Sequence, residues 1–156
     1  MGVQRALIVL LAVVLAAVAG VGAPRTEALA QQSSSDIATR YERWQQAQDL
    51  EQLISDGEEL LALEQSQTNW PLPISRARFK AQVSLGGGSA YAVRPRGARA
   101  DNLERAIDYL DAALREFTFA SDPQDWARAH NNAGIARWSR IRGDRADNQE
   151  RAIAHF

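Results

Sequence analysis

Apolar residues recur at spacings of three and four in the segment 36–68, which is the pattern of an amphipathic helix. The positions that set this pattern are Ile37, Tyr41, Trp44, Ala47, Leu50 and Leu53 or Ile54, and Leu60, Leu61 and Leu63 continue it. Ser55-Asp56-Gly57 can end one helix and cap another, so the segment predicts a helical hairpin, with one long helix as the alternative. The segment 69–75 contains Pro71 and Pro73 and predicts a break, because each proline removes a backbone donor.

The second half of the chain contains an internal repeat. Residues 99–107 and 145–153 are identical at eight of nine positions when the chain is shifted by 46 residues. Identities continue upstream without a gap at Ala81 and Ala127, Gly88 and Gly134, Ala90 and Ala136, Arg94 and Arg140, Arg96 and Arg142, and Gly97 and Gly143. Such a repeat indicates one supersecondary unit that occurs twice, over 76–122 and, in truncated form, over 123–156.

Each unit predicts a helix, a tight polar loop and a second helix. Asp122 and Pro123 predict the start of a helix that runs from about residue 124 to residue 140, because proline is tolerated in a first turn. Gly143 ends this helix or lies in the loop after it. The expected caps of the two second helices are Asp101 or Asn102 and Asp147 or Asn148.

The helix that begins near residue 102 carries an apolar stripe. Its members are Leu103, Ala106, Ile107, Leu110, Ala113, Leu114 and Phe117. Two antiparallel helices cannot cover such a stripe alone, so we expect successive hairpins to stack. The predicted fold class is all-α, with antiparallel hairpins stacked as a solenoid. Phe156 falls in the first turns of the last helix, so we expect an array that is incomplete at its C-terminus, either as a fragment or with the missing segment supplied by a partner.

The repeated units resemble the tetratricopeptide repeat (TPR) family, in its longer-period bacterial form. The matching residues are Gly88 and Tyr91 in the first helix, Ala106, Leu110 and Ala113 in the second helix, and Gly134, Ala152 and Phe156 in the later unit. The departures are Gly87 and Ala133 in place of Leu, Arg137 in place of Tyr, and a period of 46 residues where the family has about 34. The resemblance covers residues 76–156 and implies a TPR-like solenoid that binds a protein or peptide.

The resemblance also implies a binding groove along the first helices of the hairpins. In the later unit the groove face carries Arg128, Asn131, Ile135 and Trp138, and in the earlier unit it carries Gln82, Leu85, Ser89 and Ala92. An asparagine can bond a peptide backbone, an arginine a carboxylate, and a tryptophan can anchor a partner. The alternative is that Trp138 packs on the neighbouring hairpin and the polar side chains are solvated.

Residues 1–30 have the order of a secretory signal peptide. Arg5 precedes an uncharged run over 6–23, and Ala28-Leu29-Ala30 suits a signal peptidase. We expect cleavage after Ala30, with residues 31–35 as a polar linker and a periplasmic or extracellular product. The alternative is a retained inner-membrane anchor, because the apolar run approaches the length of a short spanning helix.

Charge and composition narrow the function further. Lys and Arg (18) nearly balance Asp and Glu (19), which does not favour a nucleic-acid partner. Stacked units would gather loop arginines into a ridge that could attract phosphate: Arg94, Arg96, Arg99, Arg140, Arg142 and Arg145. The alternative is that Arg99 and Arg145 pair with nearby carboxylates or with helix C-terminal carbonyls. The chain has no cysteine, which excludes disulfides, a thiol nucleophile and thiolate metal sites.

Few residues offer catalytic chemistry. His130 and His155 are the only histidines, and they form no zinc motif. His130 occupies the position at which the resemblance places a Trp, which indicates a packed or half-exposed structural role in preference to a ligand. Gly86-Gly87-Gly88 lacks the Lys-Ser/Thr of a phosphate loop, so it indicates close helix packing or a local break. We therefore expect no catalysis, no cofactor and no metal.

The sequence thus predicts an exported TPR-like scaffold for protein–protein or peptide binding, with self-association through the open last repeat as a further option. One alternative is the regulatory or sensing front of a larger enzyme, such as a caspase-like peptidase whose catalytic domain lies beyond residue 156. Another is a membrane-anchored organiser, if the leader is retained.

Overall fold

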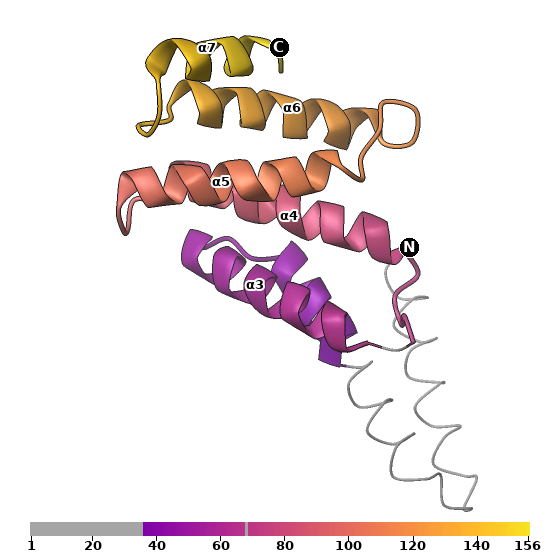
Figure 1. Cartoon of the computed structure of the whole chain (residues 1–156). Coiled ribbons are helices and arrows are strands. Elements are labelled where there is room, and N and C mark those ends of the chain that lie inside the picture. The colour runs from indigo at the N-terminus through magenta and orange to yellow at the C-terminus, as the bar shows by residue number, and fades with distance from the viewer. Residues whose placement is uncertain (1–35, 68) are drawn as a thin grey trace, which may run out of the picture. The chain divides into compact units, whose positions relative to one another are not determined.

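The computed structural model describes residues 36–67 and 69–156, and these residues form helices and loops with no strand among them (Figure 1). A helical segment over 36–45 is followed by α3 (Leu50–Ser66), α4 (Arg76–Val93), α5 (Arg99–Leu114), α6 (Pro123–Trp138) and α7 (Arg145–Ile153). The predicted all-α class is confirmed. The predicted leader over 1–30 and linker over 31–35 lie outside the described residues.

Within 36–67 and 69–156, none of the helices has the length and apolar character that crossing a bilayer requires.

The first break in the helical pattern lies earlier than predicted. The chain turns over residues 46–49, and Asp49 caps α3 by accepting a hydrogen bond from the Gln52 backbone N–H at 3.0 Å. The predicted stop at Ser55–Gly57 is wrong, because α3 runs through these residues. Gly57 serves close packing instead of a turn, since a Cβ atom there would lie 3.2 Å from the Trp44 indole nitrogen.

Each helix from α3 to α7 packs against the next one along the chain, and α4 also contacts α6. Figure 1 shows successive helices running in opposite directions, with the α4–α5 and α6–α7 loops on the same side of the array. Two polar contacts join α4 to α6 and to its N-cap residue. Arg78 forms an ion pair with Asp122, and the Asn132 side-chain amide donates to the Ser89 hydroxyl at 2.8 Å. First helices of successive units are therefore neighbours.

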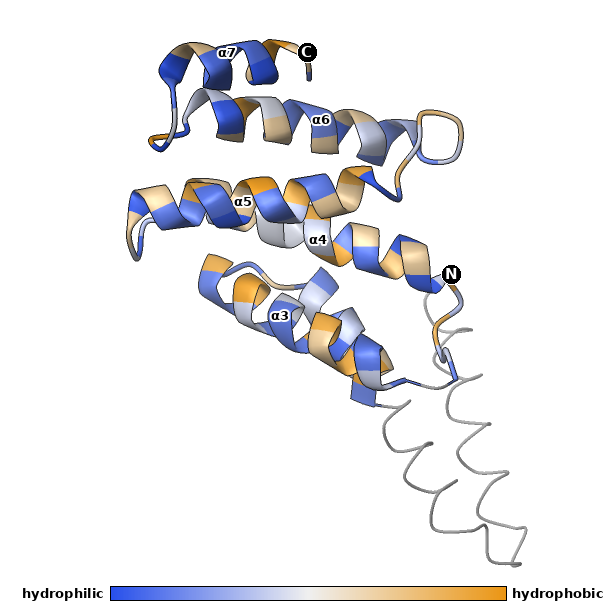
Figure 2. Ribbon diagram, in the orientation of Figure 1, coloured by the Kyte–Doolittle hydropathy of each residue, from blue (hydrophilic) through white to orange (hydrophobic). Residues whose placement is uncertain are grey.

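Two apolar clusters hold the helices together. The first joins the segment 36–45 to α3 and α4 and is aromatic, with the Tyr41 and Phe79 ring centroids 5.1 Å apart. The second joins α4, α5 and α6 through smaller residues, many of them alanine. Most of the predicted stripe belongs to this cluster: Ala106, Ile107, Leu110, Ala113 and Phe117 are buried in it, and Leu114 is partly buried against it. Leu103 is buried as well. In Figure 2, hydrophobic and hydrophilic residues alternate along the helices, and α7 is largely hydrophilic.

The two equivalent loops have the same geometry. Gly97 and Gly143 have φ angles of +80° and +82°, a region that favours glycine. The Asn102 side-chain amide donates to the Arg96 carbonyl at 2.7 Å, and the Asn148 amide donates to the Arg142 carbonyl at 2.9 Å. The repeated sequence therefore builds the same local structure twice.

The predicted caps of α5 and α7 are wrong, because both helices begin earlier than expected. Ala98 occupies the N-cap of α5 without a side-chain bond, and Asp144 caps α7 by accepting from the Ala146 and Asp147 backbone N–H groups. The asparagines instead lie in the first turn and hold the preceding loop. The predicted start of α6 is confirmed, since Asp122 is its N-cap and Pro123 its first residue.

Candidate partner-binding surface

A hollow of about 370 Å³ lies where the helical segment 36–45 meets α3, α4 and α6. We call it the first-helix hollow, because most of its wall comes from the first helices of successive hairpins. Its lining residues are Tyr41, Trp44, Gln45, Ala47, Leu53, Gln82, Leu85, Gly86, Asp125 and Arg128. Residues far apart in the sequence therefore share one concave surface.

Trp44 forms a fixed wall of the first-helix hollow. Its ring packs directly on α4 at Gly86, where a Cβ atom would lie 2.4 Å from Trp44 Cζ2. The Trp44 indole N–H donates to the Leu53 carbonyl at 3.1 Å, which sets the direction of the ring. α4 continues without a break through the three glycines, so the expected close packing is what the structure shows at Gly86.

Polar groups complete the hollow. The Tyr41 hydroxyl donates to the Gln82 side-chain oxygen, and burial raises the pKa of Tyr41, so the hydroxyl keeps its proton. Arg128 pairs with Asp125 one turn earlier at 3.2 Å, but its side chain is 68% exposed. An exposed pair of this kind is weak. Asp125 therefore holds the Arg128 side chain only weakly.

The predicted groove residues divide into two groups. Gln82, Leu85 and Arg128 line the first-helix hollow, although Leu85 is only 4% exposed and packs in the core. Asn131, Ile135 and Trp138 do not line it, and all three are exposed on α6. Trp138 is 57% exposed. Of the other residues on the predicted face, Ser89 and Ala92 are half-buried.

Several residues of this surface were not predicted. Tyr41 and Trp44 line the hollow, but the sequence predicted them only as members of an apolar stripe. Such a stripe does not indicate a hollow. The Asn132 side chain bonds Ser89 between α4 and α6. Its equivalent in the earlier unit is Gly86, so the repeat could not predict this hydrogen bond.

Three of the loop arginines, Arg94, Arg140 and Arg142, pair with carboxylates. Arg94 bonds Glu51 on α3 through two nitrogens, and Arg140 bonds Glu104 on α5 in the same way, with both distances 2.8 Å in the second pair. The bonds from these arginines lower the pKa of each carboxyl group. Arg142 pairs with Asp101 through one nitrogen.

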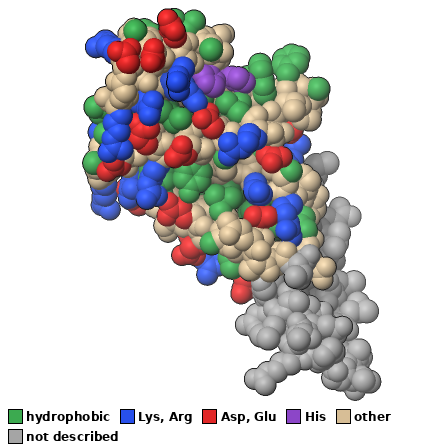
Figure 3. All heavy atoms as spheres, in the orientation of Figure 1, with side chains coloured by type: hydrophobic (Ala, Val, Ile, Leu, Met, Phe, Trp, Pro, Cys, Tyr) green, Lys and Arg blue, Asp and Glu red, His purple; other side chains and the backbone are tan. Residues whose placement is uncertain are grey.

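Arg99 donates to the Ala92 carbonyl near the end of α4. This agrees with the alternative prediction that it bonds a carbonyl at a helix C-terminus. Figure 3 shows basic and acidic side chains intermixed over the visible face. This face therefore carries no uniform basic ridge.

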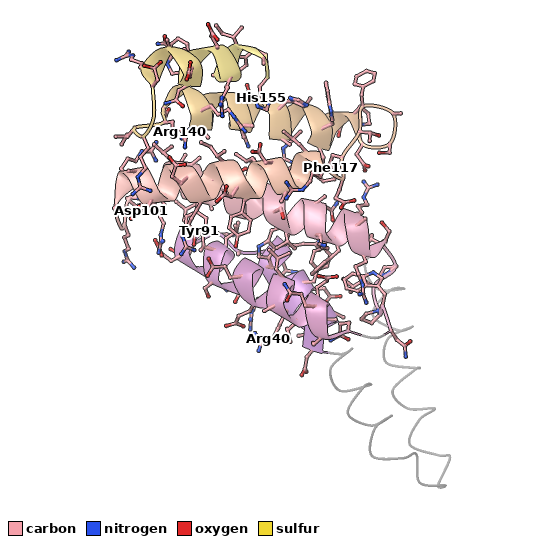
Figure 4. All side chains as sticks on the ribbon, in the orientation of Figure 1. Arg40, Tyr91, Asp101, Phe117, Arg140 and His155 are labelled. Atoms are coloured by element: carbon pink, nitrogen blue, oxygen red, sulfur yellow. The ribbon has the colours of Figure 1, made fainter. Side chains whose placement is uncertain are left out.

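The two histidines meet between α6 and α7. The His130 and His155 Nδ1 atoms are 3.1 Å apart, and the His130 ring lies 4.4 Å from the Trp126 ring. Figure 4 shows His155 where α7 faces α6. Burial lowers the pKa of His155, and Arg137 and His130 add to the effect. His130 is partly buried, in agreement with the packed or half-exposed structural role that was expected.

Among residues 36–67 and 69–156, no group of three or more His, Asp or Glu side chains could hold a metal ion.

No protein-family model, curated protein or solved structure gives a match to this chain. The fold and the surface define the class of protein only as an all-helical protein with a hairpin that occurs twice.

Proposed function

We propose that the protein is an exported, non-enzymatic, TPR-like scaffold that binds a peptide or protein segment at the first-helix hollow. The observation that carries the proposal is the contact between α4 and α6, which brings first helices together and leaves a concave surface beside them. A solenoid of stacked hairpins requires this contact between successive units.

The repeat supports the stacking part of the proposal. Equivalent residues make equivalent contacts with the preceding second helix, as Arg94 does with Glu51 on α3 and Arg140 with Glu104 on α5. Tyr91 and Arg137 also occupy equivalent positions, and each reaches a carboxylate of the preceding second helix, Glu58 or Asp111. These equivalent contacts support one stacking relation for both units.

The hollow favours an extended peptide that carries a carboxylate. Arg128 supplies an exposed guanidinium group, and Gln45 is an exposed amide that can bond a peptide backbone. The apolar part of the lining comes from Ala47, Leu53 and the edges of the aromatic rings. A groove that is already formed lowers the conformational-entropy cost of binding such a peptide.

Selection of a random peptide library on the mature chain, residues 31–156, tests the binding proposal. We expect enriched sequences that contain Asp or Glu and lose most of their affinity for the Arg128→Gln variant. The Arg115→Gln variant is the matched control, because Arg115 is an exposed arginine outside the hollow. Failure to enrich any sequence, or equal binding to both variants, would contradict the proposal.

The export part of the proposal has its own test. Expression with residues 1–30 in a Gram-negative host, followed by N-terminal sequencing of the periplasmic product, should find Gln31 as the first residue. A product that keeps the leader and sediments with the inner membrane would favour the anchored alternative.

A further inference from the structure

α5 shows how one second helix receives the next hairpin. Asp101 pairs with Arg142, Glu104 with Arg140, and Asp111 with Arg137. These three carboxylates are spaced by three and seven residues, so they lie on one face of α5. Ile107 falls on the same face and is only 9% exposed. The face toward α6 is thus a row of carboxylates with an isoleucine among them.

α7 repeats this face without its partner. Asp147, Glu150 and Ile153 are the residues 46 positions after Asp101, Glu104 and Ile107. Asp147 and Glu150 are exposed and have no ion-pair partner among the described residues, and Ile153 is 63% exposed. We call Asp147, Glu150, Ile153 and Phe156 the end surface.

Phe156 shows that the end surface has the same register as α5. A Cβ atom at Gly88 would lie 2.7 Å from Leu110 Cγ, and one at Gly134 would lie 2.7 Å from Phe156 Cζ. Leu110 and Phe156 therefore pack on equivalent glycines. Leu110 is fully buried whereas Phe156 is 72% exposed, because Phe156 is covered on one side only.

We propose that the end surface binds a helical hairpin of this same repeat, whose first helix is followed by Arg-x-Arg-Gly. This motif follows both α4 and α6, as Arg94-Pro95-Arg96-Gly97 and Arg140-Ile141-Arg142-Gly143. The first arginine of the motif pairs with Glu150 in the geometry of Arg140 with Glu104, and the third residue pairs with Asp147 as Arg142 does with Asp101. Ile153 and Phe156 are then covered as Ile107 and Leu110 are. This proposal does not depend on the first-helix hollow or its ligand.

The occupant follows from charge complementarity. A hairpin that lacked the two arginines would bury Glu150 beside apolar residues without a counter-ion, which is unfavourable. A hairpin that carries them gains a two-nitrogen bond to Glu150 of the kind that Glu104 makes. The acidic row therefore selects among hairpins and sets their register.

The test is a chain with one added unit. A second copy of residues 111–156 is appended after Phe156, which places its first-helix arginines in the register of Arg140 and Arg142. We expect a higher Tm than that of the original chain. In the extended chain, Asp147→Asn with Glu150→Gln should raise the unfolding equilibrium constant about fivefold, the effect of a partly exposed, well-aligned pair. In the original chain the same substitutions should leave it nearly unchanged.

Two controls make the result specific. Glu42→Gln with Glu116→Gln removes two exposed carboxylates elsewhere and should have an equally small effect in both chains. Replacing the two appended arginines by Gln should abolish the extra sensitivity of the extended chain to the Asp147 and Glu150 substitutions.

Two outcomes would overturn the proposal. One is an extended chain that is no more stable than the original chain, or that loses the same stability on substitution of Asp147 and Glu150 with and without the appended arginines. The other is a dimer of the original chain, seen by sedimentation equilibrium, that the appended unit abolishes, since the occupant would then be a second copy of this chain.

Discussion

The α4–α5 unit and the α6–α7 unit share a sequence motif and a loop but differ in burial. Gly97 and Gly143 have nearly the same φ angle, and Asn102 and Asn148 make the same bond to the loop. Ile107 is 9% exposed, however, whereas its equivalent Ile153 is 63% exposed. The repeated motif therefore encodes local structure, and the neighbouring helices determine which side chains become core.

The largest expected difference concerns the residues that pack on the equivalent glycines. Leu110→Ala should lower the free energy of unfolding by about 2–5 kcal/mol, because Leu110 is fully buried and its loss leaves a cavity. Phe156→Ala should cost about 1 kcal/mol or less, because most of that ring is already in water. Urea unfolding followed by circular dichroism measures both, and equal costs would show that the two units are buried alike.

The glycines themselves give the next test. Gly88→Ala should destabilise the protein by about 1–3 kcal/mol, because the added methyl meets Leu110 Cγ at 2.7 Å and the Ala106 backbone oxygen at 3.1 Å. Gly134→Ala meets only the exposed Phe156 ring, which can move, and gains up to about 1 kcal/mol of helix propensity. The same unfolding experiment should find the second variant neutral or more stable. A large loss in Gly134→Ala would mean that Phe156 is held in place.

The loop glycines should behave identically in the two units. Gly97→Ala and Gly143→Ala each place a side chain at positive φ, which costs about 1 kcal/mol. Thermal unfolding of both variants measures this strain. Costs that differ by more than a factor of two would contradict the claim that the motif encodes local structure independently of burial.

The smallest expected effect is electrostatic and depends on pH. The bonds from Arg140 hold the pKa of Glu104 below its ordinary value of 4.5, so this pair contributes stability above about pH 4.5 and loses it as the pH falls through the depressed pKa. Glu104→Gln should therefore lower the Tm at pH 7 and have little effect near pH 3. Glu150→Gln, its equivalent without a partner, should change the Tm little at either pH. Scanning calorimetry at the two pH values separates these outcomes.

Periodicity and the repeat predicted the parts of the fold that depend on local sequence. The apolar stripe of α5, the start of α6 at Asp122-Pro123 and the loop position of Gly143 were confirmed. The predicted caps of α5 and α7 were wrong, because the Asp and Asn residues chosen lie inside the first turns, and the folded loops place Ala98 and Asp144 at the N-caps. Asn148 was assigned to capping, but its amide is needed to hold the Arg142 carbonyl.

The surface was harder to predict than the helices. Arg128, Gln82 and Leu85 were placed near a groove by family resemblance, but the aromatic wall was not. The wall depends on contacts between residues far apart in the sequence, such as Trp44 on Gly86. Trp44 also explains the misplaced break, because Gly57 packs against the Trp44 ring and does not form a turn.

The most direct test of the central claim, that first helices of successive units lie side by side, is a disulfide between Ser89→Cys and Asn132→Cys. The two side chains are in hydrogen-bond contact, and the chain has no other cysteine to compete. Mild oxidation should give an intramolecular disulfide in most molecules with an unchanged circular dichroism spectrum, while Ser89→Cys paired with the exposed neighbour Asn131→Cys should react far more slowly. Equal and slow reaction of both pairs would contradict the stacked arrangement of α4 and α6.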